Sequence, residues 1–333
     1  MTARPPRRGV VTLTPAGAID ATYLVDGFAR GDLIRASEYA REVSGKGVNL
    51  SAALDLAGVP TAAVVVLGHD DLAFAGHSPH AGMLRIVPVP GATRVNTAIV
   101  DADGATTKVN APTPPLSADA WAQATDTALS EAAASGAEWL VLCGSLPVLA
   151  GTGRPVDATE LFTRARERGI RVAVDTSGTG LARALGATPD LDLIKPNTAE
   201  LAELTGRALV TVGDVVAAAR TLIDRGLRLA YVSMGADGAL AVSADEVVHA
   251  HARPRRLGNT AGAGDASLAG FLVGLADGGS APLESAVAHA AAWGAHAVAQ
   301  TTTVLPGLGG LPEAVVTVAP DPATALSEPA GGA

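Results

Sequence analysis

Residues 118–143 read ADAWAQATDTALSEAAASGAEWLVLC, and residues 158–174 read ATELFTRARERGIRVAV. In each stretch an alanine-rich helical pattern is followed by a short apolar segment, Trp139–Cys143 in the first and Arg171–Val174 in the second. Strands that alternate with helices are typical of βαβ units, whose parallel sheet is covered by helices on both faces. The two stretches therefore predict an α/β fold with a mainly parallel sheet.

The same alternation extends along most of the 333 residues. Further strand-like and helical stretches are Val10–Leu13, Ala62–Leu67, Leu191–Ile194, Val212–Arg225, Leu229–Ser233, Ala239–Val242 and Leu283–Ala299. Residues 1–8 and 319–333 are rich in Pro, Ala, Gly or Arg, and we expect both ends to be disordered. A single large domain over residues 9–318 is the simplest organisation.

Two regions, at about 21–41 and 93–110, interrupt this rhythm with short alternating segments. In the second region Asp103-Gly104 is a hairpin signal. We expect these regions to form a small β-sheet outside the main body, which would act as a lid or as a contact between two subunits.

Composition excludes several classes of partner. The chain has 24 basic and 33 acidic residues, a net charge of −9, which argues against nucleic acid as the main partner. No segment has the roughly 20 apolar residues of a membrane-spanning helix. Cys143 is the only cysteine, so an internal disulfide is excluded, and we expect a cytoplasmic protein.

The densest chemical signal is GNTAGAGD at residues 258–265. A turn of small residues at a helix N-terminus presents backbone N–H groups and a positive dipole to an anion. The amides of Gly262, Ala263 and Gly264 would stabilise a phosphoryl group in transfer, and the Asp265 carboxylate would take the proton of an acceptor hydroxyl. A tight loop with an acidic helix cap is the alternative interpretation of this string alone.

Two further segments follow strand-like runs, where open α/β sheets place ligands. Lys195-Pro196-Asn197 precedes Glu200, and this pair of Asn and Glu would share a ligand or form an ordinary capping box. The segment SMGADG at residues 233–238 would admit the close approach of a ligand to its backbone, or form a hairpin turn.

Together these segments resemble the PfkB/ribokinase family of carbohydrate kinases, and most of all its 1-phosphofructokinase and tagatose-6-phosphate kinase branch. The resemblance covers about residues 12–306. The family's motifs occur in their usual order, at Thr12–Ala16 with Asp20, Gly45–Asn49, Gly144–Pro147, Asp175–Ser177, Lys195–Asn197 with Glu200, Ser233–Gly235 and Gly262–Asp265.

The resemblance implies a Rossmann-like, ribokinase-like domain with a β lid, and ATP and Mg²⁺ as nucleotide and metal. It makes Asp265 the general base beside an anion hole at Gly262, Ala263 and Gly264. The residues implied at the nucleotide are Lys195, Asn197, Ser233, Gly235, Gly238, Thr260 and Gly294. Asn197 and Glu200 would approach Mg²⁺ through water. The residues implied at the sugar are Asp20, Gly45, Gly47, Asn49 and Ser145.

Lys46 and Arg94 indicate that the substrate already carries a phosphate. A lysine in a Gly-rich turn of a purely sugar-binding site has no obvious partner, whereas a phosphate provides one. Arg94 would supply a second cation. Within the branch, the overall resemblance and no single residue makes the phosphorylation of fructose 1-phosphate to fructose 1,6-bisphosphate our first choice. The alternatives are tagatose 6-phosphate or fructose 6-phosphate as substrate, or a non-catalytic sugar-phosphate sensor on a kinase scaffold. A homodimer through the lid is also expected.

Overall fold

A ten-stranded sheet forms the centre of the computed structural model, which describes residues 9–187, 190–258, 260–300 and 302–331. The predicted disorder of residues 1–8 concerns a segment outside these residues. The strand order is β15-β14-β13-β12-β10-β9-β8-β1-β4-β5. The bounds of these strands are β1 Val10–Thr14, β4 Thr61–Gly68, β5 Leu84–Val89, β8 Trp139–Cys143, β9 Arg171–Asp175, β10 Leu193–Ile194, β12 Ala230–Ser233, β13 Ala239–Val242, β14 Val247–Ala252 and β15 Ala314–Val318.

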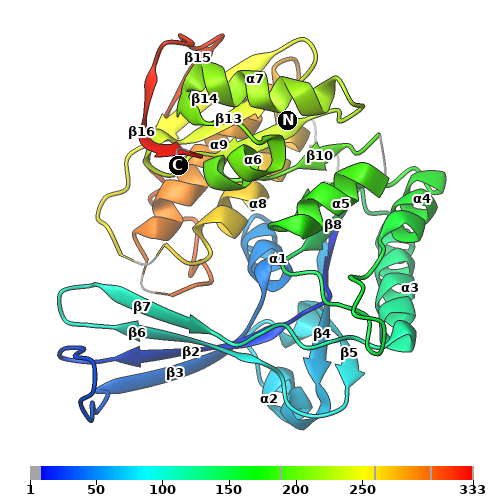
Figure 1. Cartoon of the computed structure of the whole chain (residues 1–333), viewed down its shortest axis with the longest axis vertical. Coiled ribbons are helices and arrows are strands. Elements are labelled where there is room, and N and C mark those ends of the chain that lie inside the picture. The colour runs from blue at the N-terminus through cyan, green and yellow to red at the C-terminus, as the bar shows by residue number, and fades with distance from the viewer. Residues whose placement is uncertain (1–8, 188–189, 259, 301, 332–333) are drawn as a thin grey trace, which may run out of the picture.

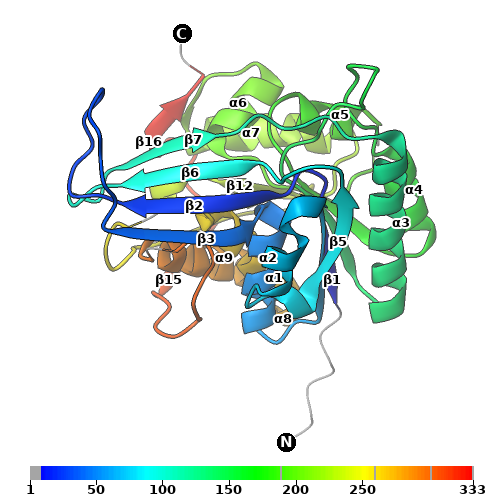
Figure 2. The same cartoon turned by 90° about the horizontal axis from the view of Figure 1, so that it is seen from below.

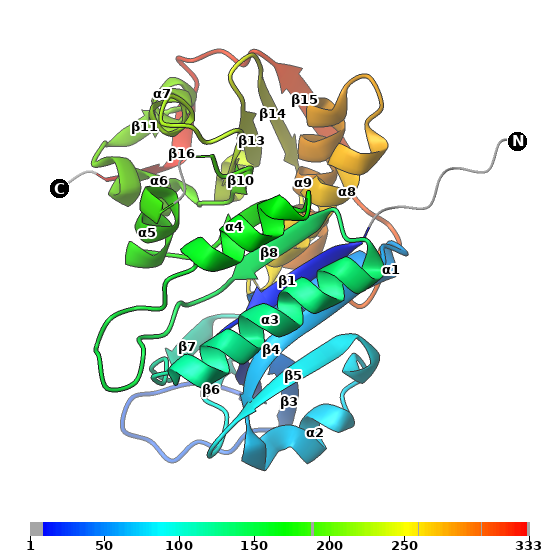
Figure 3. The ribbon, with the colours of Figure 1, turned by 90° about the vertical axis from the view of Figure 1, so that its right-hand side faces the viewer.

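The strands from β12 to β5 are parallel, and β13, β14 and β15 extend one edge of the sheet in antiparallel fashion. This arrangement confirms the predicted mainly parallel sheet. Its central strands β1 and β8 are buried throughout and mostly apolar, because helices cover both of their faces (Figures 1 and 3).

Two large apolar cores hold most of the helices on the sheet, and a third, smaller core within the described residues holds α2 and part of α1 against β4. α3, α4, α5, α6 and α7 contribute to the first core, and α1, α8 and α9 to the second. The helix bounds are α1 Lys46–Leu56, α2 Leu72–Gly76, α3 Ala118–Ser135, α4 Thr159–Glu167, α5 Thr179–Ala187, α6 Thr198–Thr205, α7 Val212–Ile223, α8 Ala263–Asp277 and α9 Pro282–Val298. α8 and α9 lie against each other, and both pack on the sheet through the second core.

The predicted lid is a separate four-stranded sheet that projects from the body (Figures 1 and 2). Its order is β3-β2-β6-β7, with bounds β2 Ala18–Leu24, β3 Glu38–Ser44, β6 Val95–Val100 and β7 Thr106–Asn110. Asp101 closes the β6–β7 hairpin, because its carboxylate accepts hydrogen bonds from the backbone N–H groups of Asp103 and Ala105. The hairpin signal at Asp103-Gly104 is thus confirmed.

The C-terminal segment differs from the expected disordered tail. Ala325–Ala330 forms strand β16, which pairs antiparallel with β11 (Leu209–Thr211) in a third, two-stranded sheet. Leu326 is buried in the first core, and this apolar anchor supplies the burial that the composition of the tail did not indicate. Within the described residues, none of the helices has the length and apolar character needed to cross a membrane.

Candidate active site

A cleft of about 1150 Å³ runs between the lid and the carboxyl ends of the parallel strands. Strands β1, β8, β10 and β12 each deliver residues to it at or just after their last position, as expected for an open α/β sheet. The residues predicted for the site that line the cleft are Asp20, Gly45, Lys46, Asn49, Arg94, Ser145, Lys195, Asn197, Glu200, Ser233, Gly235, Gly238, Thr260, Gly262, Ala263, Gly264, Asp265 and Gly294. Motifs far apart in the sequence therefore meet at one place.

Gly47 is the predicted site residue that does not line the cleft. It lies on the first turn of α1 against β1, where its N–H donates to Thr14 Oγ1 and its carbonyl accepts from Thr12 Oγ1. A Cβ at this position would come within 2.4 Å of Thr14 Oγ1. Gly47 is therefore required for the close packing of α1 on β1, and it supports the site from behind.

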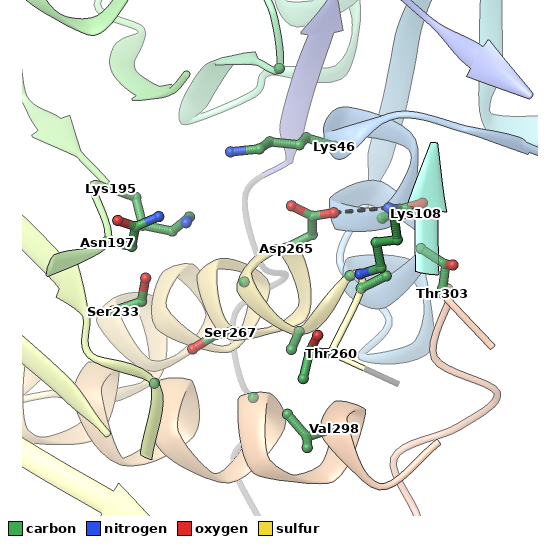
Figure 4. A pocket seen from close by; sticks show the side chains of 18 of the residues that line it. Lys46, Lys108, Lys195, Asn197, Ser233, Thr260, Asp265, Ser267, Val298 and Thr303 are labelled. Atoms are coloured by element: carbon green, nitrogen blue, oxygen red, sulfur yellow. Dashed lines mark hydrogen bonds between the residues drawn. The ribbon is translucent and has the colours of Figure 1, made fainter. Parts of the chain in front are cut away.

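Asp265 lies in the first turn of α8 and is 6% exposed. Gly262, with φ of +76°, caps the helix and accepts backbone hydrogen bonds from Asp265 and Ala266. Asn49 on α1 donates from Nδ2 to Asp265 Oδ2 at 2.8 Å. These contacts fix one carboxylate oxygen and direct the group into the cleft (Figure 4).

The environment raises the pKa of Asp265 to about 6. Burial is the largest cause, because it penalises the charged form, and the nearby Asp175 carboxylate adds to it. Lys46, the hydrogen bond from Asn49, and Lys195 act in the opposite direction. The result is a carboxylate that is ionised at neutral pH and yet basic enough to accept a proton.

Asp175, at the end of β9, connects the two lysines of the cleft. Its Oδ1 lies 2.7 Å from Lys46 Nζ and 3.4 Å from Lys195 Nζ, and the side chain is 1% exposed. Burial alone would raise the pKa of Asp175, but the two ammonium groups outweigh it and lower the pKa. From the sequence, Asp175 was named only as part of a family motif and was given no role. Its position directly after an apolar strand could have indicated that it lies at the site.

Lys46 has a protein partner that the sequence did not reveal. Burial lowers its pKa, but Asp175 and Asp265 more than compensate, so the ammonium stays charged. Figure 4 shows Lys46 reaching across the cleft above Asp265, toward the side that carries Lys195 and Asn197. The lysine therefore lies near the centre of the cleft, between two carboxylates.

The lid end of the cleft carries polar groups suited to a sugar. Asp20 accepts hydrogen bonds from Ser44 Oγ at 2.7 Å and from Asn96 Nδ2 at 3.1 Å. The buried Oδ1 atoms of Asn49 and Asn96 have no hydrogen-bond partner among the described residues. Both residues line the cleft, but these two oxygen atoms are out of contact with solvent, so Asp20 is the acceptor that this end of the cleft offers to a ligand hydroxyl.

Arg94 directs three of its five N–H groups at the protein. It donates to the carbonyl groups of Gly17 and Ala16, and to Thr113 Oγ1 at 3.1 Å. Burial lowers its pKa, and Asp20 counteracts this shift. These contacts hold the guanidinium in the cleft wall and leave two N–H groups without a protein acceptor in the described part of the chain.

Lys108 and Thr303 line the cleft and were not predicted. Lys108 comes from lid strand β7, and Figure 4 shows it on the side of Asp265 opposite Asn197. Neither residue belongs to a local motif, because the first lies on a strand of ordinary alternating pattern and the second in a loop after α9. They reach the site only through the tertiary fold.

Asn197 and Glu200 form the capping box that the sequence left open. Asn197 Oδ1 accepts from the Glu200 N–H at 2.8 Å, and Glu200 Oε2 accepts from the Asn197 N–H at 2.9 Å. Glu200 Oε1 takes no part in the box, and the residue lines the cleft. A carboxylate oxygen that the capping box leaves free suits Mg²⁺, which is usually held by one or two carboxylates, phosphates and waters.

Two of the glycines predicted to lie along the nucleotide, Gly238 and Gly294, are also required by the packing of the fold. A Cβ on Gly238, whose φ is +91°, would come within 2.2 Å of the Ala250 carbonyl oxygen on β14. A Cβ on Gly294 would meet Ser267 Oγ at 3.2 Å, between α9 and α8. Gly238 thus permits the tight β12–β13 turn, and Gly294 the close packing of two helices, while both leave the cleft open.

The start of α8 has the geometry of an anion site. Ala263 donates to the Thr260 carbonyl at 3.4 Å, and Asp265 donates to Gly262. The Gly264 N–H has no backbone acceptor among the described residues, as is usual in a first helical turn. A Cβ on Gly264 would lie 3.3 Å from Lys195 Nζ, so this amide and that ammonium are neighbours in the cleft.

Comparison with known proteins points to one family. The model of the pfkB family carbohydrate kinases matches residues 13–307. The chain is similar to 1-phosphofructokinases from Rhodobacter capsulatus and Xanthomonas campestris. The first is 40% identical, over 79% of this chain and 82% of its own length. The second is 38% identical, over 80% of this chain and 83% of its own length.

A solved structure shows the same architecture. The phosphofructokinase-2 from Escherichia coli in complex with fructose-6-phosphate superposes with a TM-score of 0.74 at 27% identity. The match covers 88% of this chain and 94% of that one. The resemblance noted from the sequence motifs is confirmed at the level of the whole domain.

Proposed function

Because this chain belongs to the pfkB family of carbohydrate kinases, we propose that it uses ATP to phosphorylate fructose 1-phosphate to fructose 1,6-bisphosphate. The similarity to two 1-phosphofructokinases at 38–40% identity supports the choice of substrate. The observation that carries the proposed chemistry is Asp265. It is a buried carboxylate with a pKa of about 6, located where the lid side and the nucleotide side of the cleft meet.

The reaction would be a single in-line transfer. The 6-hydroxyl of the sugar gives its proton to the Asp265 carboxylate, and its oxygen forms a bond to the γ-phosphorus of ATP. The bond between that phosphorus and the oxygen bridging to the β-phosphate breaks, and ADP leaves. The amide of Gly264 and the ammonium groups of Lys46 and Lys195 stabilise the negative charge on the transferring group.

The sugar phosphate would occupy the lid half of the cleft. The Asp20 carboxylate accepts hydrogen bonds from its hydroxyls, and Asn49 and Asn96 line the same cleft. Arg94 and Lys108 bind the phosphate that the substrate already carries. Lys46 was expected at that phosphate, but its place between Asp175 and Asp265 favours contact with the group in transfer.

ATP would lie along the segment of residues 233–238 and the start of α8, with the adenine near Gly294 and Val298. Mg²⁺ neutralises phosphate charge when it is bound, and Glu200 would hold it through water, with Asn197 keeping that carboxylate in place. Since ATP is a substrate, we place the protein in the cytoplasm.

Two subunits would associate through the exposed face of the lid. Tyr23 and Tyr39 face each other across β2 and β3 with ring centroids 4.7 Å apart, and Tyr39 is 54% exposed. Val109 on β7 adds a further exposed apolar side chain. Adjacent exposed aromatic groups on a thin sheet are typical of an interface between proteins.

An assay of ADP release tests the proposed activity and its substrate together. The purified protein, with MgATP, is given fructose 1-phosphate, fructose 6-phosphate, tagatose 6-phosphate and free fructose in turn. Fructose 1-phosphate should give the highest kcat/KM. Turnover of none of the four by folded protein would exclude the kinase function.

Fructose 6-phosphate is the second candidate substrate, because the Escherichia coli structure that superposes on this chain holds it. A higher kcat/KM for fructose 6-phosphate would favour that assignment. Binding of a sugar phosphate without ADP release would instead favour a sensor.

A further inference from the structure

The C-terminal strand β16 reaches the nucleotide side of the cleft. It lies beyond residues 13–307, which match the family model, and it is anchored in the body by buried Leu326. Glu328, two residues further, lines the cleft, and its Oε2 would lie 3.4 Å from a Cβ placed on Gly235. The end of the chain thus forms part of the cleft wall beside residues 233–238.

Ser327 connects this strand to the same turn by two hydrogen bonds. Its backbone N–H donates to Asp237 Oδ2 at 2.8 Å, and its hydroxyl donates to Asp237 Oδ1 at 2.6 Å. Both oxygens of one carboxylate are therefore engaged by one residue, 90 positions away in the sequence. On the other side of the turn, His249 Nε2 donates to the Asp237 carbonyl at 2.6 Å.

The turn needs such support because of its own composition. Residues 235–237 form a single 3₁₀ turn that begins at Gly235 and is followed by Gly238, and both glycines have positive φ, at +58° and +91°. Glycine-rich turns lose more backbone freedom than others when they become ordered. A turn that is already ordered before the ligand arrives binds it more tightly, because binding then carries no further ordering cost.

We propose that β16 belongs to the nucleotide site, with Ser327 and Asp237 as positioning residues that hold the 233–238 turn in its binding conformation. This inference rests on the proposed function, which places ATP along that turn. Neither residue lines the cleft, so they act through Gly235 and Gly238. The sugar phosphate site and Asp265 belong to other elements and are independent of this contact.

Two variants remove the contact, one from each side. Ser327→Ala deletes the hydroxyl donor, and Asp237→Asn replaces one of the two accepting oxygens by a donor. Ser327→Thr keeps the hydroxyl and should restore the contact. Ser243→Ala is the matched control, because Ser243 organises the neighbouring β13–β14 turn by similar hydrogen bonds and does not line the cleft.

ATP binding is measured by calorimetric titration, and KM and kcat by ADP release. Because a hydrogen bond to a charged group is lost, Ser327→Ala and Asp237→Asn should each raise the Kd and KM for ATP about fivefold. The KM for the sugar phosphate and kcat should change less than about twofold. Ser327→Thr and Ser243→Ala should match the unaltered protein.

An unchanged Kd for ATP in both Ser327→Ala and Asp237→Asn would overturn the proposal. The same holds if Ser243→Ala weakens ATP binding equally, or if KM for the sugar phosphate rises in parallel with that for ATP. If the unaltered protein binds no ATP, the proposed function itself fails, and the two failures are thereby distinguished.

Discussion

At the scale of single residues, Asp265 combines two properties that an exposed helix cap does not have. Its burial keeps the pKa near 6, and its hydrogen bond from Asn49 fixes its orientation. A base of this strength is ionised at physiological pH, and it accepts a proton from a hydroxyl more readily than an ordinary aspartate.

Replacement of this base should abolish turnover and spare binding. Asp265→Asn is expected to lower kcat by about 10²-fold to 10⁴-fold, while calorimetry shows a nearly unchanged Kd for ATP. The amide oxygen of the substituted side chain would still accept the hydrogen bond from Asn49. Retention of more than about a tenth of the activity would mean that another group takes the proton.

The pH dependence of the unaltered protein follows from the same carboxylate. The rate should fall as the pH drops through about 6, because the protonated form is no longer a base. The folded pKa lies above the ordinary value of 3.8, so ionisation between pH 3.8 and about 6 costs roughly 3 kcal/mol of folding stability. At pH 7.5, Asp265→Asn should therefore melt at a higher temperature than the unaltered protein. A lower melting temperature would contradict this account of the pKa.

Lys46 and Arg94 should affect different kinetic constants. Lys46→Met should lower kcat by about tenfold or more, because it removes a charge from the transferring group. Arg94→Met should mainly raise KM for fructose 1-phosphate and reduce its advantage over free fructose. If Lys46→Met raises only the KM for fructose 1-phosphate and leaves kcat unchanged, Lys46 binds the phosphate that the substrate already carries.

At the scale of elements, the start of α8 is fixed by contact with the loop after α9. A Cβ on Gly262 would come within 2.0 Å of the Thr303 carbonyl oxygen, and its φ of +76° is unfavourable for any other residue. The proposed anion site at the start of α8 therefore needs glycine at position 262, and the loop after α9 forms part of its surroundings.

Gly262→Ala should destabilise the protein by roughly 3 kcal/mol in chemical denaturation and remove activity, because strain and overlap add. Gly279→Ala is the matched control, since Gly279 also has positive φ, +54°, but no neighbour within 4 Å of an added Cβ. That variant should lose only about 1 kcal/mol and remain active. If Gly262→Ala and Gly279→Ala lose the same free energy of unfolding, the structure has shifted to relieve the overlap between the added Cβ and Thr303.

At the scale of the whole molecule, the lid carries both the groups that we propose to bind the sugar and the exposed aromatic pair. Its inner face supplies Asp20, Asn96 and Lys108 to the cleft, and Tyr23 and Tyr39 are paired across its strands. If two subunits associate through this sheet, formation of the dimer would also affect the proposed sugar site, because the same strands carry both.

Tyr39→Asp should therefore shift the protein from dimer to monomer in analytical ultracentrifugation, because a charge would be buried in the interface. Val315→Asp, an equally exposed position on β15 away from the lid, should leave the mass unchanged. A monomer in the unaltered protein would exclude the lid dimer.

Most of the fold follows from local pattern. The strand at Trp139–Cys143 and the helices near α3 and α9 were predicted within one or two residues, because apolar periodicity and capping residues act over short distances. The lid hairpin was predictable for the same reason, since Asp103-Gly104 favours a tight turn. The ordered motifs likewise indicated Asp265, Asn197 and the glycine turns.

The sequence by itself thus determined the α/β class, the lid and the identity of the proposed base. Only the tertiary structure decided which charges meet: Asp175 between Lys46 and Lys195, Lys108 across the cleft from Asn197, and Ser327 on Asp237. Such contacts join residues that are far apart in the chain, so they cannot be predicted from the local sequence pattern. The pKa of Asp265 belongs to the same category, because burial and neighbouring charge arise only when the chain has folded.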